Sequence, residues 1–309
     1  MRQDEIIRIF PERLQKLLMA YIRDWDQLQE IHIRCFSQLI LRINGEKVEM
    51  KEPVWQVSRQ DFREIMDHIS NYSFYALEEE IRNGFLTIPG GHRIGLCGRV
   101  VYENGRIRTM RNICFLNLRV AHEIKGCADR VLPLLYEKDR FLSTLIVSPP
   151  GFGKTTMLRD LVRRLADGSE EKEARRVAVI DERSEIGACY QGIPQNDLGM
   201  HCDVLDGCRK SEGIYRVLRS MAPEIIAVDE IGGKMDFEAL EVALTSGCGL
   251  LATIHGSSYE QLLEKDGMQR LIVNGMFSRI LFLTKVEQGK KYPGVVTSVR
   301  DAQGQELLL

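Results

Sequence analysis

The sequence contains no long hydrophobic run and carries almost no excess of charge. Its longest apolar stretches, such as residues 142–147 and 225–228, are far shorter than the roughly 20 residues that a membrane-spanning helix needs. The formal net charge of its 309 residues is −2, so no overall positive field draws the protein to nucleic acid or anionic lipid. The N-terminus also lacks the apolar core of a signal peptide. We therefore expect a cytoplasmic protein.

Paired cysteines are absent as well. The eight cysteines are scattered singly, with no Cys-x-x-Cys pair, and most of them lie among apolar residues. We expect reduced, buried thiols of the kind found in the cytosol. His201, Cys202, Asp203 and Cys208 form a group that in principle could hold zinc. Because they lack a second close ligand pair, a loop with incidental thiols is favoured.

Two different patterns meet near residue 125, which predicts one domain over residues 1–124 and a second over residues 125–309. In the first domain, Asn44-Gly45 and Asn104-Gly105 each supply the two positive φ angles of a tight hairpin. The segments that flank these pairs have the alternation of apolar and polar residues that is typical of strands. We therefore expect a smaller, mixed α+β domain built on an antiparallel sheet.

Helices are expected between these hairpins and at both ends of the first domain. Ser58 is a good N-cap for a helix with one apolar face, and a helix over about residues 73–83 is expected to end at Gly84. Apolar residues at helical spacing predict a helix over residues 6–22. Another helix, over residues 127–138, is expected to lead into the second domain.

The second domain has the pattern of an α/β fold. Apolar strands alternate with helices, as they do in a parallel sheet with crossover helices. The strands are expected over residues 142–147, 176–180, 225–228 and 249–254, and the first helix over residues 153–166. Residues just past the carboxyl ends of parallel strands line the ligand crevice. Here each strand is followed by residue types that phosphate chemistry needs.

The strongest motif is a glycine-rich phosphate-binding loop after the first of these strands. The residues expected to bind a nucleotide are Ser148, Pro149, Pro150, Gly151, Phe152, Gly153, Lys154, Thr155 and Thr156. Glycines 151 and 153 let backbone amides turn toward phosphate oxygens at a helix N-terminus. Lys154 is expected to reach the β- and γ-phosphates, and the Thr155 hydroxyl to ligate Mg²⁺. Ser148 departs from the Gly-x-x-x-x-Gly-Lys-Ser/Thr pattern, where a glycine is usual.

Acidic residues follow two other strands. Asp229-Glu230 has the form of a Walker B strand end, where Asp229 would hold the metal and Glu230 would polarise water or bind metal. Asp181-Glu182-Arg183-Ser184-Glu185 forms an acidic box whose carboxylates repel one another unless a cation offsets them. A Mg²⁺-nucleotide would do so, with Asp181 as a metal ligand and Glu182 or Glu185 as general base. A solvated turn balanced by Arg183 is the alternative.

A histidine and three arginines complete the candidate set. Thr253 and His255 end the last predicted strand, and His255 is positioned to sense the γ-phosphate. Arg93, Arg99 and Arg119 lie in the glycine-rich strands of the first domain. In a ring ATPase, an arginine from a flanking domain can stabilise the charge on the transferring phosphoryl group.

These motifs, in this order, resemble those of the secretion ATPase superfamily, which includes the motors of type II and type IV secretion and of type IV pili. Within it the sequence is most similar to the stage III sporulation AA family. The segments that carry this resemblance are SPPGFGKTTMLRD (148–160), IDERSEI (180–186), VLDG (204–207), AVDEIGG (227–233), GHRIGLCGR (91–99) and LNLRVAHE (116–123). The box differs from that of the secretion motors, so the choice between Glu182 and Glu185 stays open, and the zinc-binding cysteine set of some members is absent.

The resemblance implies a RecA-like P-loop ATPase that uses ATP and Mg²⁺ and assembles as a homohexameric ring with nucleotide between subunits. It also implies that the N-terminal domain supplies arginines to the shared site, for which Arg93, Arg99 and Arg119 are the candidates. It also implies a motor on the cytoplasmic, mother-cell side of a membrane-spanning channel to the forespore. The partners would be the membrane-embedded components of the stage III channel complex.

Two other functions remain as alternatives. A nucleic-acid-dependent RecA-like ATPase would need a basic groove dotted with aromatic residues, and the near-neutral charge and 7% aromatic content argue against one. A small-molecule kinase would need an acceptor site and an arginine-rich lid, and no such segment follows the Walker B strand. We therefore expect no specific nucleic acid as a partner.

Overall fold

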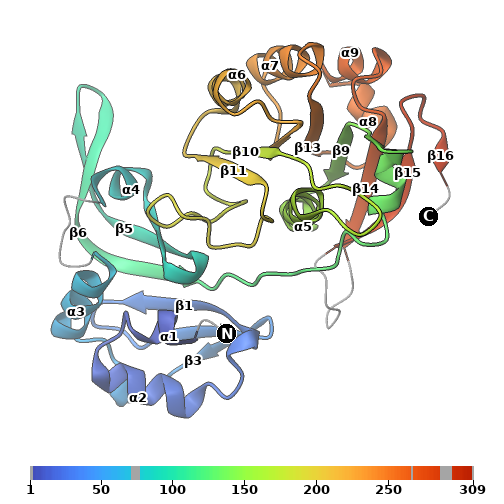
Figure 1. Cartoon of the computed structure of the whole chain (residues 1–309). Helices are drawn as coiled ribbons and strands as arrows, with labels where there is room; N and C mark the ends of the chain where they lie inside the picture. Colours follow the sequence, from blue (N-terminus) through green and yellow to red (C-terminus); the bar gives the residue numbers. More distant parts are fainter. Residues whose placement is uncertain (1–2, 71–76, 266, 286–293, 308–309) are drawn as a thin grey trace. The chain divides into compact units, whose positions relative to one another are not determined.

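The computed structural model describes residues 3–70, 77–265, 267–285 and 294–307 of the chain, which divides into two compact units, Met1–His122 and Glu123–Leu309 (Figure 1). This division lies next to the boundary at residue 124 that the sequence predicts. Each unit has its own main sheet, with one hydrophobic core in the first unit and two in the second. The predicted class, an α/β unit with a smaller mixed α+β unit before it, is confirmed.

The first unit is built on a six-stranded antiparallel sheet in the order β3-β2-β1-β6-β5-β4. Its elements are α1 (Gln3–Ile7), α2 (Glu12–Tyr21), β1 (Leu28–Arg34), β2 (Ile40–Ile43), β3 (Glu46–Glu49), α3 (Arg59–Ile69), α4 (Glu78–Asn83), β4 (Phe85–Ile88), β5 (His92–Glu103) and β6 (Arg106–Arg119), with 3₁₀ turns at Trp25–Gln27, Pro53–Trp55 and Pro89–Gly91. Leu14 and Leu18 of α2 and Ile65 of α3 share one buried cluster with Ile31 of β1.

Local turn and cap signals in this unit are confirmed. Asn44 and Gly45 have φ angles of 51° and 83° in the β2–β3 hairpin, and Asn104 and Gly105 have 50° and 73° between β5 and β6. The Ser58 hydroxyl accepts the Asp61 amide at 3.0 Å, and the Asp61 carboxylate accepts the Ser58 amide at 2.8 Å, which closes a capping box on α3. Such reciprocal bonds satisfy amides that the first helical turn leaves unpaired.

Two predicted helices are wrong. The helix expected over residues 6–22 is interrupted, because Pro11 has no amide hydrogen to continue α1, and α2 starts after it. Residues 127–138 hold only a 3₁₀ turn, Leu132–Leu135, which contains Pro133, and the start of a two-stranded ribbon of β7 (Tyr136–Glu137) and β8 (Arg140–Phe141). The helix expected over 73–83 is seen as α4, which ends at Gly84 as predicted, and its expected start lies outside the described residues.

The second unit is a three-layer α/β structure around an eight-stranded sheet in the order β11-β10-β12-β13-β9-β14-β15-β16. The strands from β11 to β14 in this order are parallel, and β15 and β16 are antiparallel additions. The elements are β9 (Thr144–Ser148), α5 (Lys154–Asp167), β10 (Val177–Asp181), β11 (Cys202–Asp206), α6 (Lys210–Ser220), β12 (Ile225–Val228), α7 (Lys234–Thr245), β13 (Gly249–His255), α8 (Tyr259–Leu263), α9 (Met268–Val273), β14 (Arg279–Lys285), β15 (Gly294–Arg300) and β16 (Glu306–Leu307).

Alternate residues of the central strands pack into two separate hydrophobic cores. In β10, Val177 and Val179 pack with α5, whereas Ala178 and Ile180 pack with residues of α6 and α7. Figure 1 shows α5 on one face of the sheet and α6 and α7 on the other. Because both faces are covered, the strands are apolar throughout, which is why four of them could be predicted from the sequence.

The strand β11 was not predicted. Cys202 lies in it, so the expectation of a loop at this place is wrong. The strand is half-exposed at the edge of the sheet and carries Asp203 and Asp206, which break the apolar pattern. All eight cysteines are free thiols, but Cys97 is exposed, and only Cys189 and Cys248 are buried, so the expectation of buried thiols holds for a minority.

Candidate nucleotide-binding site

The predicted phosphate-binding loop connects β9 to α5 with the geometry that the motif requires. Gly151 and Gly153 have φ angles of 78° and 83°, a region that is strained for other residues. Ser148, the last residue of β9, is fully buried and has a negative φ, so a glycine is not required there. Its hydroxyl donates to the carbonyl of Pro149 at 3.0 Å.

Lys154 is buried at the start of α5, and all three of its N–H donors are used. The Nζ atom donates to the carbonyls of Ser148 and Pro149, each at 3.1 Å, and to Nδ1 of His255 at 3.0 Å. Burial lowers the pKa of Lys154, and the nearby carboxylates of Asp229 and Glu230 act in the opposite direction. The lysine is therefore held between the loop and the end of β13.

His255 connects Lys154 to Glu230. An ammonium group has no acceptor, so Nδ1 of His255 must accept and its Nε2–H must donate. The Nε2 atom lies 3.0 Å from Oε1 of Glu230. This arrangement defines a neutral imidazole protonated on Nε2, with one ring nitrogen on the phosphate loop and the other on the Walker B acid.

Asp229, just after β12, contacts both the start of α5 and the strand β13. Its Oδ2 atom accepts the Thr155 hydroxyl at 2.7 Å, and its Oδ1 atom accepts the Thr253 hydroxyl. The amide of Glu230, a residue with φ of 51°, donates to the Thr253 hydroxyl at 2.8 Å. The hydroxyl of Thr155 and the carboxylate of Asp229 are hard oxygen donors of the kind that Mg²⁺ prefers, so these residues fit that ion.

Asp181, at the end of β10, is buried and shapes the acidic box. Its Oδ1 atom accepts the amide of Glu185 at 2.9 Å, and its Oδ2 atom accepts those of Ile186 and Gly187 at 2.9 and 2.8 Å. Burial raises the pKa of Asp181 to about 6, although the amides act the other way. Both oxygens of this carboxylate are thus engaged by the turn that follows it.

The other residues of the box contact different elements of the second unit. Glu182 pairs with the buried Lys210 at the start of α6. Nη1 of Arg183 lies 2.7 Å from Oε2 of Glu230. The Ser184 hydroxyl donates to Asp206 at the end of β11 at 2.5 Å. The box is therefore a fixed turn.

Sequence reasoning did not assign Lys210, Asp206 or Arg159, which hold this turn. Arg159 of α5 donates from Nη2 to the carbonyl of Glu185 at 2.8 Å and from Nε to that of Ile186 at 2.9 Å. Its position four residues after Thr155 places it on the same helical face as that threonine, which is the one signal that would have suggested a role at the site.

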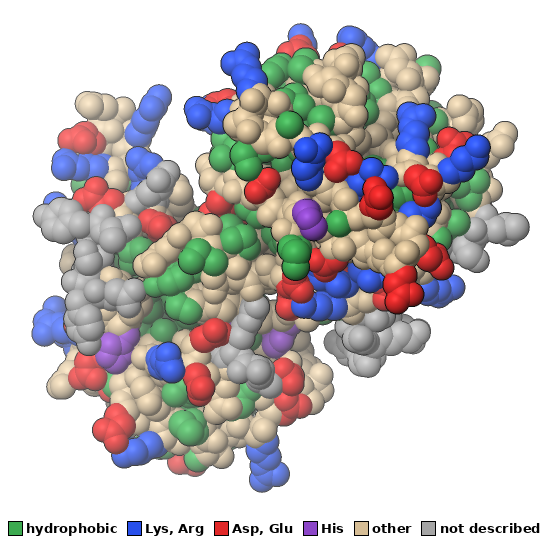
Figure 2. Space-filling model, in the orientation of Figure 1, with side chains coloured by type: hydrophobic (Ala, Val, Ile, Leu, Met, Phe, Trp, Pro, Cys, Tyr) green, Lys and Arg blue, Asp and Glu red, His purple; other side chains and the backbone are tan. Residues whose placement is uncertain are grey.

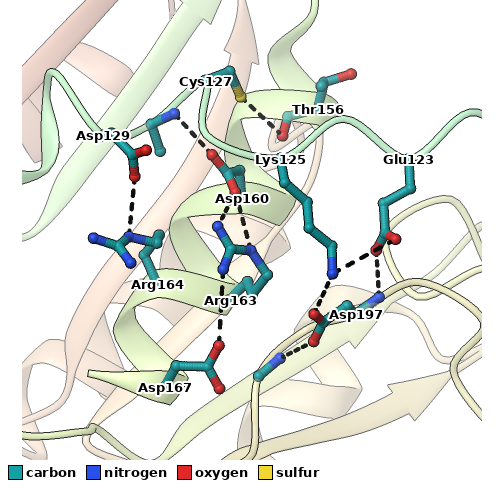
Figure 3. Close-up of polar contacts among 12 residues, drawn as sticks. Glu123, Lys125, Cys127, Asp129, Thr156, Asp160, Arg163, Arg164, Asp167 and Asp197 are labelled. Atoms are coloured by element: carbon teal, nitrogen blue, oxygen red, sulfur yellow. Dashed lines mark hydrogen bonds and ion pairs between the residues drawn. The ribbon is translucent and has the colours of Figure 1, made fainter. Parts of the chain in front are cut away.

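A segment over residues 123–129 docks on α5 beside the loop (Figure 3). The buried carboxylate of Asp160 accepts the amide of Ala128 at 2.8 Å, and the Cys127 thiol points at the carbonyl of Thr156, 3.8 Å away. Lys125 and Glu123 converge on Asp197, whose amide donates to Glu123 at 2.6 Å. The segment is therefore an integral part of the second unit.

The three candidate arginines all lie in the first unit, in β5 and β6. The guanidinium of Arg93 stacks 3.6 Å from the ring centroid of Phe85, and Arg119 lies beside Glu30 at 3.7 Å. Arg93 faces Arg119 across β5 and β6, and Arg99 faces Arg111. A role for Arg93, Arg99 or Arg119 in phosphate chemistry stays a prediction.

The described residues contain no group of three or more His, Cys, Asp and Glu side chains arranged to hold a metal ion. This holds for the group of His201, Cys202, Asp203 and Cys208 as well. His201 instead contacts the carbonyl of Ala166 at 3.0 Å.

No helix in the described ranges is long and apolar enough to cross a membrane. On the face shown in Figure 2, acidic and basic side chains are interspersed over both units.

Comparison with known proteins identifies the family. The family model described as sporulation stage III, protein AA, matches residues 1–307. The chain is 39% identical over 305 residues to the stage III sporulation protein AA of Bacillus subtilis (strain 168), covering 98% of this chain and 97% of that protein. The ATPase DotB of Yersinia pseudotuberculosis has a similar structure, with a TM-score of 0.62 and 14% identity over 95% of this chain and 80% of DotB.

The pilus retraction motor PilT, solved with bound ADP, gives a TM-score of 0.61 and 16% identity over 93% of this chain and 81% of PilT. At these identities the structural likeness shows that the chain shares its fold with DotB and PilT. The match to the family model and to the Bacillus subtilis protein extends over nearly the whole chain, and the chain therefore belongs to the sporulation stage III protein AA family.

Proposed function

We propose that this protein binds Mg²⁺-ATP at the loop over residues 148–156 and hydrolyses it. The observation that carries the proposal is the chain of contacts from Lys154 through His255 to Glu230, with 3.0 Å at each step. It joins a phosphate-binding lysine to an acid that is suited to polarise water. The likeness in fold to DotB, an ATPase, and to PilT, solved with ADP, supports this assignment.

Phosphate binding requires Lys154 to exchange partners. Its three donors are saturated by two carbonyls and His255, so the ammonium would give up some of these bonds to phosphate oxygens. The backbone amides at the start of α5 and the positive end of that helix favour the same anion. Once Lys154 turns to phosphate, Nδ1 of His255 loses its hydrogen bond to the ammonium. This loss is how the histidine would sense the γ-phosphate.

Mg²⁺, when bound, neutralises charge on the β- and γ-phosphates. The Thr155 hydroxyl and the Asp229 carboxylate would hold it, and they already lie 2.7 Å apart. Asp181 was expected as a further ligand. Since its two oxygens accept three backbone amides, we propose that it shapes the acidic box and does not bind the metal.

We propose Glu230 as the acid that orients and activates the attacking water. It is held by His255 on one oxygen and by Arg183 on the other. Glu182 instead pairs with the buried Lys210 at the start of α6, whereas Glu230 is the acid linked through His255 to Lys154. Glu185, whose backbone is fixed on both sides, is the second candidate.

At the level of assembly we propose a homohexameric ring on the cytoplasmic, mother-cell face of the stage III channel complex, with membrane-embedded components of that complex as partners. One of Arg93, Arg99 and Arg119 would act on the nucleotide of a neighbouring subunit. Membership of the sporulation family and the likeness in fold to the PilT motor support this proposal.

ATPase activity measured against protein concentration tests both the proposed hydrolysis and the proposed assembly. Shared sites predict that specific activity rises as the protein assembles. Lys154→Ala should abolish turnover, and Lys234→Ala, at an exposed lysine paired with Glu238 on α7, should not change it. Unchanged turnover in Lys154→Ala would overturn the assignment. Stimulation by single-stranded DNA would favour the nucleic-acid-dependent alternative.

A further inference from the structure

Arg159 is a charged side chain in the second unit to which the proposed mechanism gives no role. It leaves α5 one helical turn after Thr155 and donates to two successive carbonyls, of Glu185 at 2.8 Å and of Ile186 at 2.9 Å. Both partners are neutral. Burial lowers the pKa of Arg159, while the charges of Glu123, Asp181 and Asp229 favour its ionised form. A planar fork that spans two adjacent carbonyls is a bidentate geometry that lysine cannot reproduce.

The same turn is held from the opposite side. The amides of Glu185, Ile186 and Gly187 donate to Asp181 at the end of β10. The backbone of Glu185 is thus fixed by its N–H group on the sheet and by its C=O group on α5. Since α5 begins at Lys154, the contact from Arg159 joins the helix that follows the phosphate-binding loop to the acidic box.

A third contact extends this support. The buried Asn196 donates from Nδ2 to the same carbonyl of Ile186 at 2.9 Å. The next residue, Asp197, is clamped by Glu123 and Lys125 (Figure 3). Two side chains from separate segments therefore converge on the carbonyl of Ile186, the residue that directly follows the box.

We propose that Arg159 is a positioning residue that fixes the acidic-box turn relative to the phosphate-binding loop, so that the carboxylates of the box keep their places when nucleotide is bound. This inference rests on the proposed ATPase function. A cation suits this position because the negative charges of Asp181 and Asp229 both act on Arg159. Loss of the guanidinium would leave the charge of these two acids less compensated. It would also loosen the turn.

The test compares Arg159→Gln and Arg159→Lys with Arg164→Gln as a matched control. Arg164 lies on the same helix but faces Asp129, a half-exposed acid outside the box. Arg159→Gln should lower kcat by about 10- to 100-fold through misplacement of the box, with the affinity for ADP unchanged. Arg159→Lys keeps the charge and should recover part of kcat. Arg164→Gln should match the wild type.

A second measurement does not depend on turnover. Hydrogen exchange at the amides of Glu185, Ile186 and Gly187 should be faster in Arg159→Gln than in the wild type or in Arg164→Gln. Unchanged exchange together with wild-type kcat would overturn the proposal, as would a loss of kcat that only follows a loss of ADP binding and melting temperature. If the wild type hydrolyses no ATP, the proposed function fails, whereas the exchange result still decides the role of Arg159.

Discussion

The ammonium of Lys154 lies 3.0 Å from Nδ1 of His255. The other ring nitrogen, Nε2, faces Glu230 at 3.0 Å. Asparagine and glutamine in place of His255 would therefore each preserve one of the two contacts. Asn in place of His255 can accept from Lys154, and Gln can donate to Glu230. We predict that His255→Ala lowers kcat by about 100-fold and that His255→Gln retains more activity than His255→Asn, as measured by single-turnover hydrolysis. Equal activity of the two amide variants would show that the Glu230 contact is not the important one.

A comparison of three acids identifies the base. Glu230→Gln should reduce kcat by about 10²- to 10⁴-fold while ATP still binds, because the amide keeps the size of the side chain. Glu182→Gln should have a small effect on kcat, since this carboxylate is engaged by Lys210. Rates and ATP affinities of these variants and of Glu185→Gln would be measured together. A larger loss of kcat in Glu185→Gln than in Glu230→Gln would transfer the assignment to Glu185.

The role of the Thr155 hydroxyl can be separated from its shape. Thr155→Val keeps the volume but removes the oxygen that lies 2.7 Å from Asp229, and it should weaken ATP binding in Mg²⁺ by about 10- to 100-fold. Thr155→Ser keeps the oxygen and should bind as the wild type does. In EDTA all three proteins should have the same affinity. A loss for Thr155→Val that persists in EDTA would contradict metal ligation.

Local signals were predictable from the sequence, and contacts between distant segments were not. The Asn-Gly turns and the capping box at Ser58 depend on a few adjacent residues, and the buried strands on uniform apolarity. Ala128, Val131 and Leu135 do have helical spacing and do enter the core against α5, but tertiary packing holds them there without a helix. Arg159 and Lys210 reach the acidic box from α5 and α6. The sequence around each of them does not predict that contact.

The titration of Asp181 predicts a characteristic pH dependence of stability. Its pKa in the folded protein is raised to about 6 by burial, whereas an unfolded aspartate has a pKa of about 3.9. The folded state therefore binds the proton more tightly, and the stability that this supplies is complete below about pH 4 and lost as the pH rises through about 6. The free energy of unfolding of the wild type minus that of Asp181→Asn should fall by about 2 kcal/mol from pH 4 to pH 7, as measured in urea.

Asp160 provides a control of opposite sign. Burial acts to raise its pKa, but the amide of Ala128 and the guanidinium of Arg163 outweigh it and hold the pKa below its ordinary value. Its contribution should be present at neutral pH and lost in acid, so Asp160→Asn should be least destabilising at low pH. If the loss of unfolding free energy changed with pH in the same direction in Asp181→Asn and Asp160→Asn, the environments assigned to the two carboxylates would be contradicted.

Ser148 is where the loop departs from the usual pattern, and its φ angle explains why. With a negative φ at the end of β9, the residue needs no glycine. Lys154 contacts only its carbonyl, which glycine would keep. Ser148→Gly should therefore leave kcat and ATP affinity unchanged and lower the free energy of unfolding by about 1 kcal/mol, because glycine loses more conformational freedom on folding. Ser148→Ala, which removes only the hydroxyl bond to Pro149, should cost less. Altered kcat in Ser148→Gly would mean that the serine backbone restrains the loop during turnover.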